Sequence, residues 1–238
     1  MNRIIERTKQ FSAQLESLNF SIDCYIYNPL EYAWQMHEAY LSRFVSRPTR
    51  TLLLGMNPGP FGMAQNGVPF GEIAAVKGFL QLDAPIGRPV IEHPKRPILG
   101  LATTRSEVSG RRLWGLLEEH YHDSEAMKGE MTVVNYCPLV FVDRGATGRN
   151  ITPDKLVKVE RLALEAVCDR YLLDVLALVQ PTYAIGVGKY AYQKLSNVAE
   201  PGGDLVIGEV LHPSPASPAA NRGWAERARD TFESLGVW

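Results

Sequence analysis

Two amide side chains and one imidazole stand directly after apolar runs that lie far apart in the 238-residue sequence. They are Asn57 after residues 51–56, Asn135 after residues 131–134 and His212 after residues 206–211. Continuous apolar runs of this length are typical of buried parallel strands. Because the carboxyl ends of such strands meet at the sheet edge where ligands bind, we expect the three side chains to line one cleft.

The chemistry of this trio differs from that of two common classes of hydrolase. No Asp or Glu stands at these strand ends, which argues against hydrolysis by a pair of carboxylates. Neither the sequence around Lys189 nor residues 55–71 fit the pattern G-x-x-x-x-G-K followed by Ser or Thr, which argues against a nucleoside triphosphatase. The trio includes no lysine, so we expect no Schiff base with a substrate.

Residues 55–71, which read GMNPGPFGMAQNGVPFG, follow the first apolar run and contain five glycines and three prolines. Proline removes amide donors and fixes φ, whereas glycine permits close backbone approach, so this segment is neither an ordinary helix nor a strand. A tight turn that only ends the strand is the simpler interpretation. The length of the loop, with Asn57, Phe61 and Phe70 inside it, favours a binding site.

Composition excludes several classes of protein. The charged fraction of 21% and the apolar fraction of 45% are ordinary for a soluble globular chain, and no apolar run is long enough to span a membrane. The first 20 residues have helical spacing and no secretory signal. Cys24, Cys137 and Cys168 form no metal-ligand pair, so we expect buried thiols in a reducing compartment, and no iron–sulfur cluster or zinc site.

The net charge of −1 gives no sign of a nucleic-acid partner, but the charge distribution is uneven. Residues 88–112 contain six basic side chains and two acidic ones. Such a run is usually a solvated face, and contact with DNA is the alternative. Residues 83–109 are also long, irregular and rich in proline and glycine, which is typical of a functional or disordered segment.

The periodicity predicts a single α/β domain over residues 1–238. Strands are expected at 51–56, 131–134, 182–187 and 206–211. Helices are expected at 4–18, 29–45, 70–82, 110–121, 152–179 with Thr152 as its N-cap, around 190–195, and 221–235. Strands separated by helices predict a three-layer α/β/α fold with a central, mainly parallel four-stranded sheet and with the helices of residues 1–48 packed on it.

In these motifs the chain resembles the uracil-DNA glycosylase superfamily, and specifically the single-strand-selective monofunctional uracil-DNA glycosylases. The first family motif resembles residues 55–71 almost throughout, and the second resembles residues 212–215 (HPSP) through Asn221, Gly223 and Trp224. Residues 92–97 (EHPKRP), 106–110 (SEVSG) and 135–139 (NYCPL) resemble the family in the same order. The resemblance extends from about residue 52 to the C-terminus.

The resemblance implies an enzyme that hydrolyses N-glycosidic bonds in DNA. It would flip and excise uracil, and some C5-modified or otherwise deaminated bases, from single- and double-stranded DNA, and so initiate base excision repair. It would act as a monofunctional glycosylase without strand cleavage, without cofactor or metal, away from membranes and as a monomer. The expected location is cytoplasmic with the nucleoid in a bacterium, or nuclear in a eukaryote.

The resemblance also assigns roles in the pocket. Asn57 would hold the attacking water, and His212 would donate to uracil O2 as negative charge gathers on the leaving base. Asn135 would accept from N3–H and donate to O4, a polarity that rejects cytosine. The remaining substrate-binding residues would be Met56 through its backbone, Gly59 beside C5, Phe61 and Met63 in the wall, and Phe70 stacked on the base.

A wedge near the C-terminus would fill the gap that the flipped nucleotide leaves. It comprises Pro213, Ser214, Pro215, Ala216 and Ser217, with Arg222 close to the phosphates. The family commonly has a long basic residue in the place of Ala216. The resemblance therefore implies a wedge that pushes more weakly, which affects duplex DNA more than single strands.

Two other functions compete with this one. The first is a catalytically silent protein that binds DNA or damaged bases with the same pocket, which the presence of both Asn57 and His212 disfavours. The second is an enzyme that acts on free nucleosides or nucleotides, which the basic segment and the proline-rich wedge disfavour.

Overall fold

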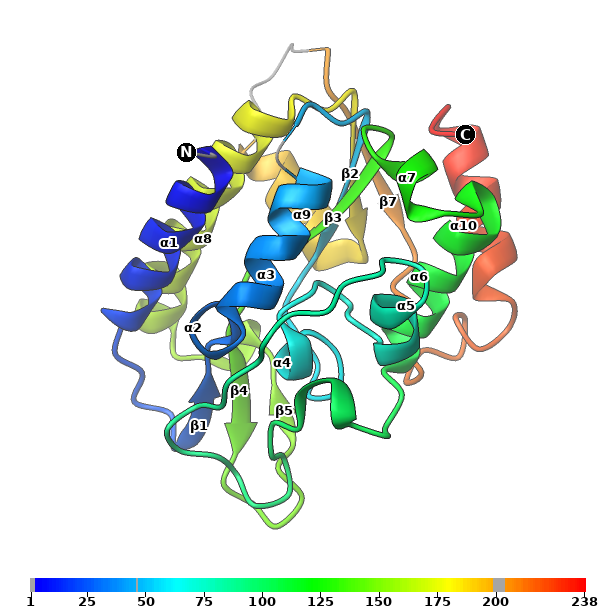
Figure 1. The fold of residues 1–238 in the computed structure, drawn as a ribbon. Helices are drawn as coiled ribbons and strands as arrows, with labels where there is room; N and C mark the ends of the chain where they lie inside the picture. Colours follow the sequence, from blue (N-terminus) through cyan, green and yellow to red (C-terminus); the bar gives the residue numbers. More distant parts are fainter. Residues whose placement is uncertain (1–2, 46, 199–203) are drawn as a thin grey trace.

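A computed structural model describes residues 3–45, 47–198 and 204–238. Within them, four strands form a parallel sheet in the order β3–β2–β6–β7 (Figure 1). The strands are β2 (Thr51–Gly55), β3 (Met131–Asn135), β6 (Tyr183–Val187) and β7 (Val206–Val210). This confirms the predicted central sheet and the position of each strand to within about one residue.

The apolar runs form strands because the sheet interior buries them. Every residue of β2 and β3 is buried, as expected for strands covered on both faces. The edge strand β7 is less covered: Val206 and Glu209 are exposed, whereas Gly208 and Val210 are buried. In the register of the sheet Gly55 lies opposite Asn135, so the segments that follow β2 and β3 leave the sheet side by side.

Helices flank this sheet on both sides, as predicted (Figure 1). The helix α9 (Lys189–Val198) packs on β6 and β7, and α10 (Trp224–Ser234) packs on β7 and on α6 (Val108–Tyr121). The N-terminal helix α1 (Arg3–Glu16) lies along α8 (Lys158–Val179), where the rings of Phe11 and Tyr171 stack at 4.1 Å. No helix in the described ranges has both the length and the apolar character needed to cross a bilayer.

A second, antiparallel sheet is absent from the sequence prediction. Its order is β1–β4–β5, formed by β1 (Cys24–Tyr27), β4 (Val140–Asp143) and β5 (Asn150–Ile151). It lies beyond the carboxyl ends of the central strands (Figure 1), and only four residues connect β3 to β4. The segment 1–48 therefore contributes a strand as well as helices.

Several predicted helices are shorter than expected. Residues 29–45 divide into α2 (Pro29–Tyr32), α3 (Trp34–Tyr40) and a π-helical turn (Leu41–Val45). Residues 70–82 contain only α5 (Ile73–Lys77). The helix expected from Thr152 begins at Lys158, because residues 153–155 form a 3₁₀ turn and residues 156–157 are extended, with Leu156 buried.

The remaining elements are short. They are α4 (Met63–Asn66), α7 (Ser124–Met127) and a 3₁₀ turn (Gly100–Ala102) within the otherwise irregular residues 83–107.

The three cysteines are free thiols. Cys137 and Cys168 are buried as predicted, whereas Cys24 is half-buried because it begins the edge strand β1.

Candidate active site

A cavity of about 410 Å³ opens at the carboxyl edge of the central sheet, and the predicted trio lines it. This volume is in the range of small-molecule binding sites. The predicted residues in its lining are Met56, Asn57, Gly59, Met63, Phe70, Asn135, His212, Ser214 and Pro215. Segments that are more than 70 residues apart in sequence thus meet around one space large enough for a base.

Asn135 is held at the end of β3 with its amide facing the cavity. The residue is 9% exposed, and its Nδ2 donates to Sδ of Met63 at 3.2 Å. A side chain on the neighbouring Gly55 would collide with Oδ1 of Asn135 and with the ring of Phe70. Glycine at the end of β2 therefore allows the amide and the aromatic ring to come together.

Phe70 adopts an unusual backbone conformation, with φ of +53°. Surrounding hydrogen bonds hold it in place: Nε1 of Trp114 donates to the Pro69 carbonyl at 3.2 Å, and the Glu72 amide donates to the Phe70 carbonyl at 2.6 Å. Strained residues persist where their surroundings over-determine them, often at ligand sites. The Phe70 ring lies 6.1 Å from the His212 ring, so both rings border the same part of the cavity.

His212 follows β7 and is half-buried. Trp224 fixes the preceding residue, because its Nε1 donates to the Leu211 carbonyl at 2.6 Å. Burial lowers the pKa of His212 below its ordinary value of 6.5. At neutral pH the ring is therefore uncharged, with one nitrogen able to donate a hydrogen bond and the other able to accept one.

Asn57 and Met56 lead out of β2 into the loop. The Asn57 amide has only a weak contact with the adjacent Pro58 carbonyl, at 3.4 Å, so most of its hydrogen-bonding capacity remains available to a ligand. The Met56 carbonyl accepts from the Cys137 amide at 2.9 Å. This bond ties the loop after β2 to the segment after β3, and it fixes the spacing between Asn57 and Asn135.

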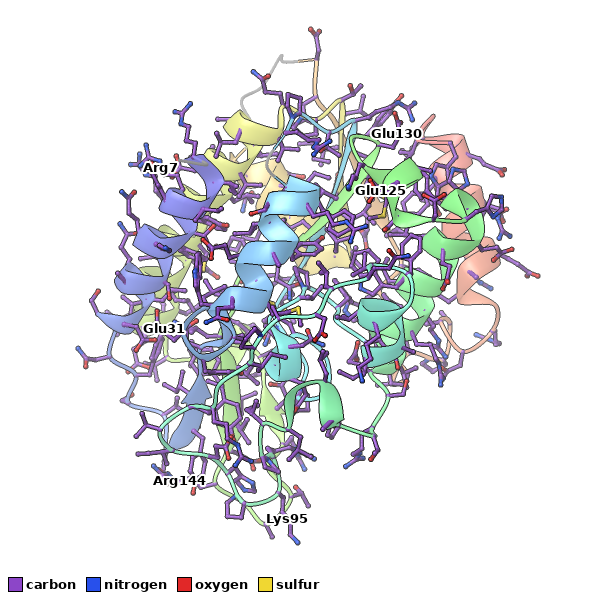
Figure 2. The ribbon with its side chains drawn as sticks, in the orientation of Figure 1. Arg7, Glu31, Lys95, Glu125, Glu130 and Arg144 are labelled. Carbon is purple, nitrogen blue, oxygen red and sulfur yellow. The ribbon has the colours of Figure 1, made fainter. Side chains whose placement is uncertain are left out.

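Phe61 lies outside the cavity lining, contrary to the prediction that it forms part of the wall. Two guanidinium groups lie over its ring instead, that of Arg105 at 4.2 Å and that of Arg96 at 5.1 Å from the ring centroid. Cation–π attraction thus places Phe61 with the basic segment at residues 88–112. Lys95 of the same segment lies with Arg144 at the far end of the three-stranded sheet (Figure 2).

Of the predicted wedge, Ser214 and Pro215 reach the cavity, whereas Pro213, Ala216, Ser217 and Arg222 lie outside its lining. Arg112 of α6 fixes this segment. It donates to the carbonyls of Pro213 at 3.1 Å and Ser214 at 3.4 Å, and to Oδ1 of Asn221 at 2.8 Å. Asn221 in turn donates to the Pro215 carbonyl at 2.9 Å. No sequence pattern indicated Arg112 as the anchor of this segment.

Six further lining residues were not predicted as site residues: Pro58, Gly62, Glu107, Ser109, Asn150 and Thr152. The last two follow from β5, the strand that periodicity missed. Oδ1 of Asn150 is buried and has no hydrogen-bond partner among the described residues, which leaves an acceptor for a ligand or water. For Glu107 and Ser109 the only signal was the similarity of residues 106–110 to a family motif.

Glu107 caps the N-terminus of α6. Its Oε2 accepts from the Gly110 amide at 2.5 Å and its Oε1 from the Ser109 amide at 3.3 Å. Burial raises the pKa of this carboxyl above its ordinary value of 4.5, while the two backbone bonds act in the opposite direction.

Within the described residues, no group of three His, Cys, Asp or Glu side chains could hold a metal ion.

A family model of the uracil DNA glycosylase superfamily matches residues 42–233, so the chain belongs to this superfamily.

The chain is 41% identical to the single-strand selective monofunctional uracil DNA glycosylase of Bos taurus over 98% of its length and 86% of the relative's. It is 40% identical to the corresponding protein of Mus musculus, over 98% and 84% of the two chains. The predicted family is therefore confirmed. A crystal structure of wild-type SMUG2 from Pedobacter heparinus has the same fold, with a TM-score of 0.67 at 18% identity over 99% of each chain.

Proposed function

We propose that this protein excises uracil from DNA by hydrolysing the N-glycosidic bond, without cleaving the strand. One observation carries the proposal: two amides and a neutral imidazole, from three strand ends, line one cavity beside an aromatic ring. The relatives at about 40% identity are named as monofunctional uracil DNA glycosylases, which supports the same chemistry here. Excision of this kind is the first step of base excision repair.

The base enters the cavity flipped out of its strand, which costs least in single strands and at mismatches. Phe70 stacks on the ring, and Asn135 reads its edge by accepting from N3–H and donating to O4. Cytosine presents the opposite polarity at both positions, and each mismatched buried polar group costs about 1–3 kcal/mol. The contact of Asn135 with Met63 supports a single orientation of the amide.

His212 and Asn57 act at the bond that breaks. As negative charge gathers on the leaving uracil, the N–H of neutral His212 donates to O2, and a donor aimed at developing charge is typically worth about 10²–10³ in rate. Asn57 positions the water that attacks the sugar. Its amide does not take up a proton, so its role is to orient the nucleophile rather than to act as a general base.

The substrate range extends to uracil with substituents at C5 and to other deaminated bases. A Cβ atom built on Gly59 has no neighbour closer than 3.8 Å, so the cavity has free space at this point. The protein excises these bases from both single- and double-stranded DNA. Its activity is lower on the duplex, because Ala216 in the wedge is exposed and short and therefore pushes weakly into the gap that the flipped base leaves.

DNA is the partner in this proposal, and the protein works as a monomer without metal or cofactor. Arg222 is exposed beside the wedge, and Arg105 and Arg96 cover Phe61, so basic groups are available to phosphates on two sides. The protein acts with the nucleoid in the cytoplasm of a bacterium, or in the nucleus of a eukaryote.

One assay tests the proposal against its two competitors. The protein is incubated with a single-stranded oligonucleotide that contains one uracil, and the product is then treated with alkali. A strand break at uracil that appears only after alkali supports the monofunctional glycosylase. Tight binding without a break would point to a silent damaged-base-binding protein with the same pocket. Release of uracil from free nucleoside alone would point to a nucleoside hydrolase.

A further inference from the structure

Asn135 can read the edge of a base only if its side-chain amide keeps one orientation. Turning the amide over exchanges Oδ1 and Nδ2, and the exchanged pair is complementary to cytosine, which accepts at N3 and donates from its N4 amino group. The oxygen and the NH₂ group of an amide have nearly the same size, so packing alone does not choose between the two orientations. A hydrogen-bond partner of the amide has to make the choice.

Met63 is that partner. Its Sδ accepts from Nδ2 of Asn135 at 3.2 Å, and in the part of the chain that the structure describes Oδ1 of Asn135 has no hydrogen-bond partner. A thioether sulfur accepts hydrogen bonds and cannot donate them. The exchanged orientation would therefore lose this bond and would place two acceptors, Oδ1 and Sδ, against each other.

The sulfur is carried by a short helix that is fixed along its length. Met63 is the first residue of α4 and is 2% exposed, and the other three residues of this helix are also buried. The hydroxyl of Tyr32 donates to the Ala64 carbonyl at 2.5 Å. Nε2 of Gln65 donates to the Pro60 carbonyl at 2.9 Å. Neighbouring segments thus hold α4 from two sides.

The end of α4 is held as well. Nδ2 of Asn66 donates to the Gly71 carbonyl at 2.5 Å, and Nδ1 of His37 lies 2.7 Å from the Gly67 carbonyl. A helix of four residues has little stability of its own, so these contacts are what keep it in place. Met63 is the one residue of α4 that lines the cavity, and the contacts therefore fix its position relative to Asn135.

We propose that Met63 is a positioning residue that excludes cytosine by holding the Asn135 amide in the orientation complementary to uracil. This inference rests on the proposed function, because it assumes that Asn135 contacts the edge of the base. Recognition is then divided between two side chains. Asn135 makes the contact with the base, and Met63 determines which end of the amide faces N3. The second N–H of Nδ2 remains available to O4.

Two variants remove the sulfur in different ways. Met63→Leu keeps nearly the same volume, a change that buried sites usually tolerate. Met63→Ala leaves space for water, which donates as well as accepts and so selects neither orientation. Met127→Leu, at a buried position outside the cavity lining, is the matched control. Thermal melting of each variant checks that it folds.

The substrates are single-stranded oligonucleotides that contain one 5-fluorouracil or one 5-fluorocytosine. Fluorine makes both bases better leaving groups, so slow excision can be measured. The measured quantity is the ratio of the single-turnover rate for the cytosine analogue to that for the uracil analogue. We expect both Met63 variants to raise this ratio by about three- to tenfold, which is the worth of one hydrogen bond between neutral groups, and Met127→Leu to leave it unchanged.

Loss of packing alone would slow the release of both bases together, so an unchanged ratio in both Met63 variants would overturn the inference. If neither variant releases the cytosine analogue, inhibition of 5-fluorouracil release by the free bases decides. The Ki of cytosine should then fall relative to the Ki of uracil, and a constant ratio of the two would contradict the proposal. If the wild-type protein does not release the uracil analogue, the proposed function fails instead, and the two failures are therefore distinguishable.

Discussion

Acid should destabilise this fold through His37, a histidine buried behind the active-site wall. His37 is 5% exposed in α3, and it borders a small internal cavity of about 20 Å³ together with Met63 and Asn135. Its Nδ1 lies 2.7 Å from the Gly67 carbonyl, and because a carbonyl only accepts, Nδ1 carries the proton. Gly67 ends α4, the short helix that begins with Met63.

Burial lowers the pKa of His37 from 6.5 to about 4, although the bond to Gly67 acts in the opposite direction. The unfolded chain therefore binds a proton more readily than the folded one between these two values, and stability falls as the pH drops. Across the full titration the free energy of unfolding falls by about 3 kcal/mol, and about 2 kcal/mol of this fall occurs between about pH 8 and about pH 5. That is a large part of a typical domain stability of about 5–15 kcal/mol.

The measurement is the free energy of unfolding in urea across this pH range, for the wild-type protein and for His37→Asn. Asparagine can still donate to the Gly67 carbonyl but does not titrate, so the loss between about pH 8 and about pH 5 should shrink by about 2 kcal/mol. His122→Asn, at an exposed position, is the matched control for removing a histidine. If His37→Asn lost as much stability in acid as the wild-type protein, another group would be responsible and this reasoning would be wrong.

Four further outcomes are expected. His212→Ala should lower single-turnover base release by about 10²–10³ with little loss of DNA binding, measured on a uracil oligonucleotide; unchanged turnover would remove the imidazole from the mechanism. Gly59→Tyr should spare uracil and hinder C5-substituted uracil, and equal losses on both would count against the open space at Gly59. Arg112→Met, which frees the wedge segment from α6, should lower base release from duplex more than from single strands, whereas Arg111→Met on the exposed face of the same helix should not. Borohydride added during turnover should trap no covalent adduct with DNA, since the proposed chemistry has no amine nucleophile.

The central sheet was predictable because its strands are mostly apolar, and burial on both faces makes that pattern plainest in β2 and β3. The second sheet was not predictable by the same means. β5 has two residues, and β1 pairs with β4 across more than 100 positions, from Cys24 to Asp143. Strands this short have no measurable period, and their pairing depends on tertiary contacts.

The site divides in the same way. The residues that follow the strands could be predicted, because the topology of a parallel sheet brings its strand ends to one edge whatever the conformation of the loops. Phe61 lies outside the cavity lining, although the resemblance implied a place in the wall; the guanidinium groups of Arg105 and Arg96 lie over its ring instead. Asn150 and Thr152 were missed with the strand β5 that brings them to the cavity.

Helix α6 positions more of the site than its hydrophobic periodicity indicates. Its pattern predicts an ordinary amphipathic helix. Glu107, the N-cap of this helix, lines the cavity, and Trp114 within the helix donates to the Pro69 carbonyl. Gly110 between them lets the helix approach closely, since a side chain there would collide with the Phe70 carbonyl. Arg112, on another face, holds the wedge. The Phe70 backbone, the cavity wall at Glu107 and the segment 213–215 thus all contact α6 or its N-cap, so a tilt of α6 would move all three together.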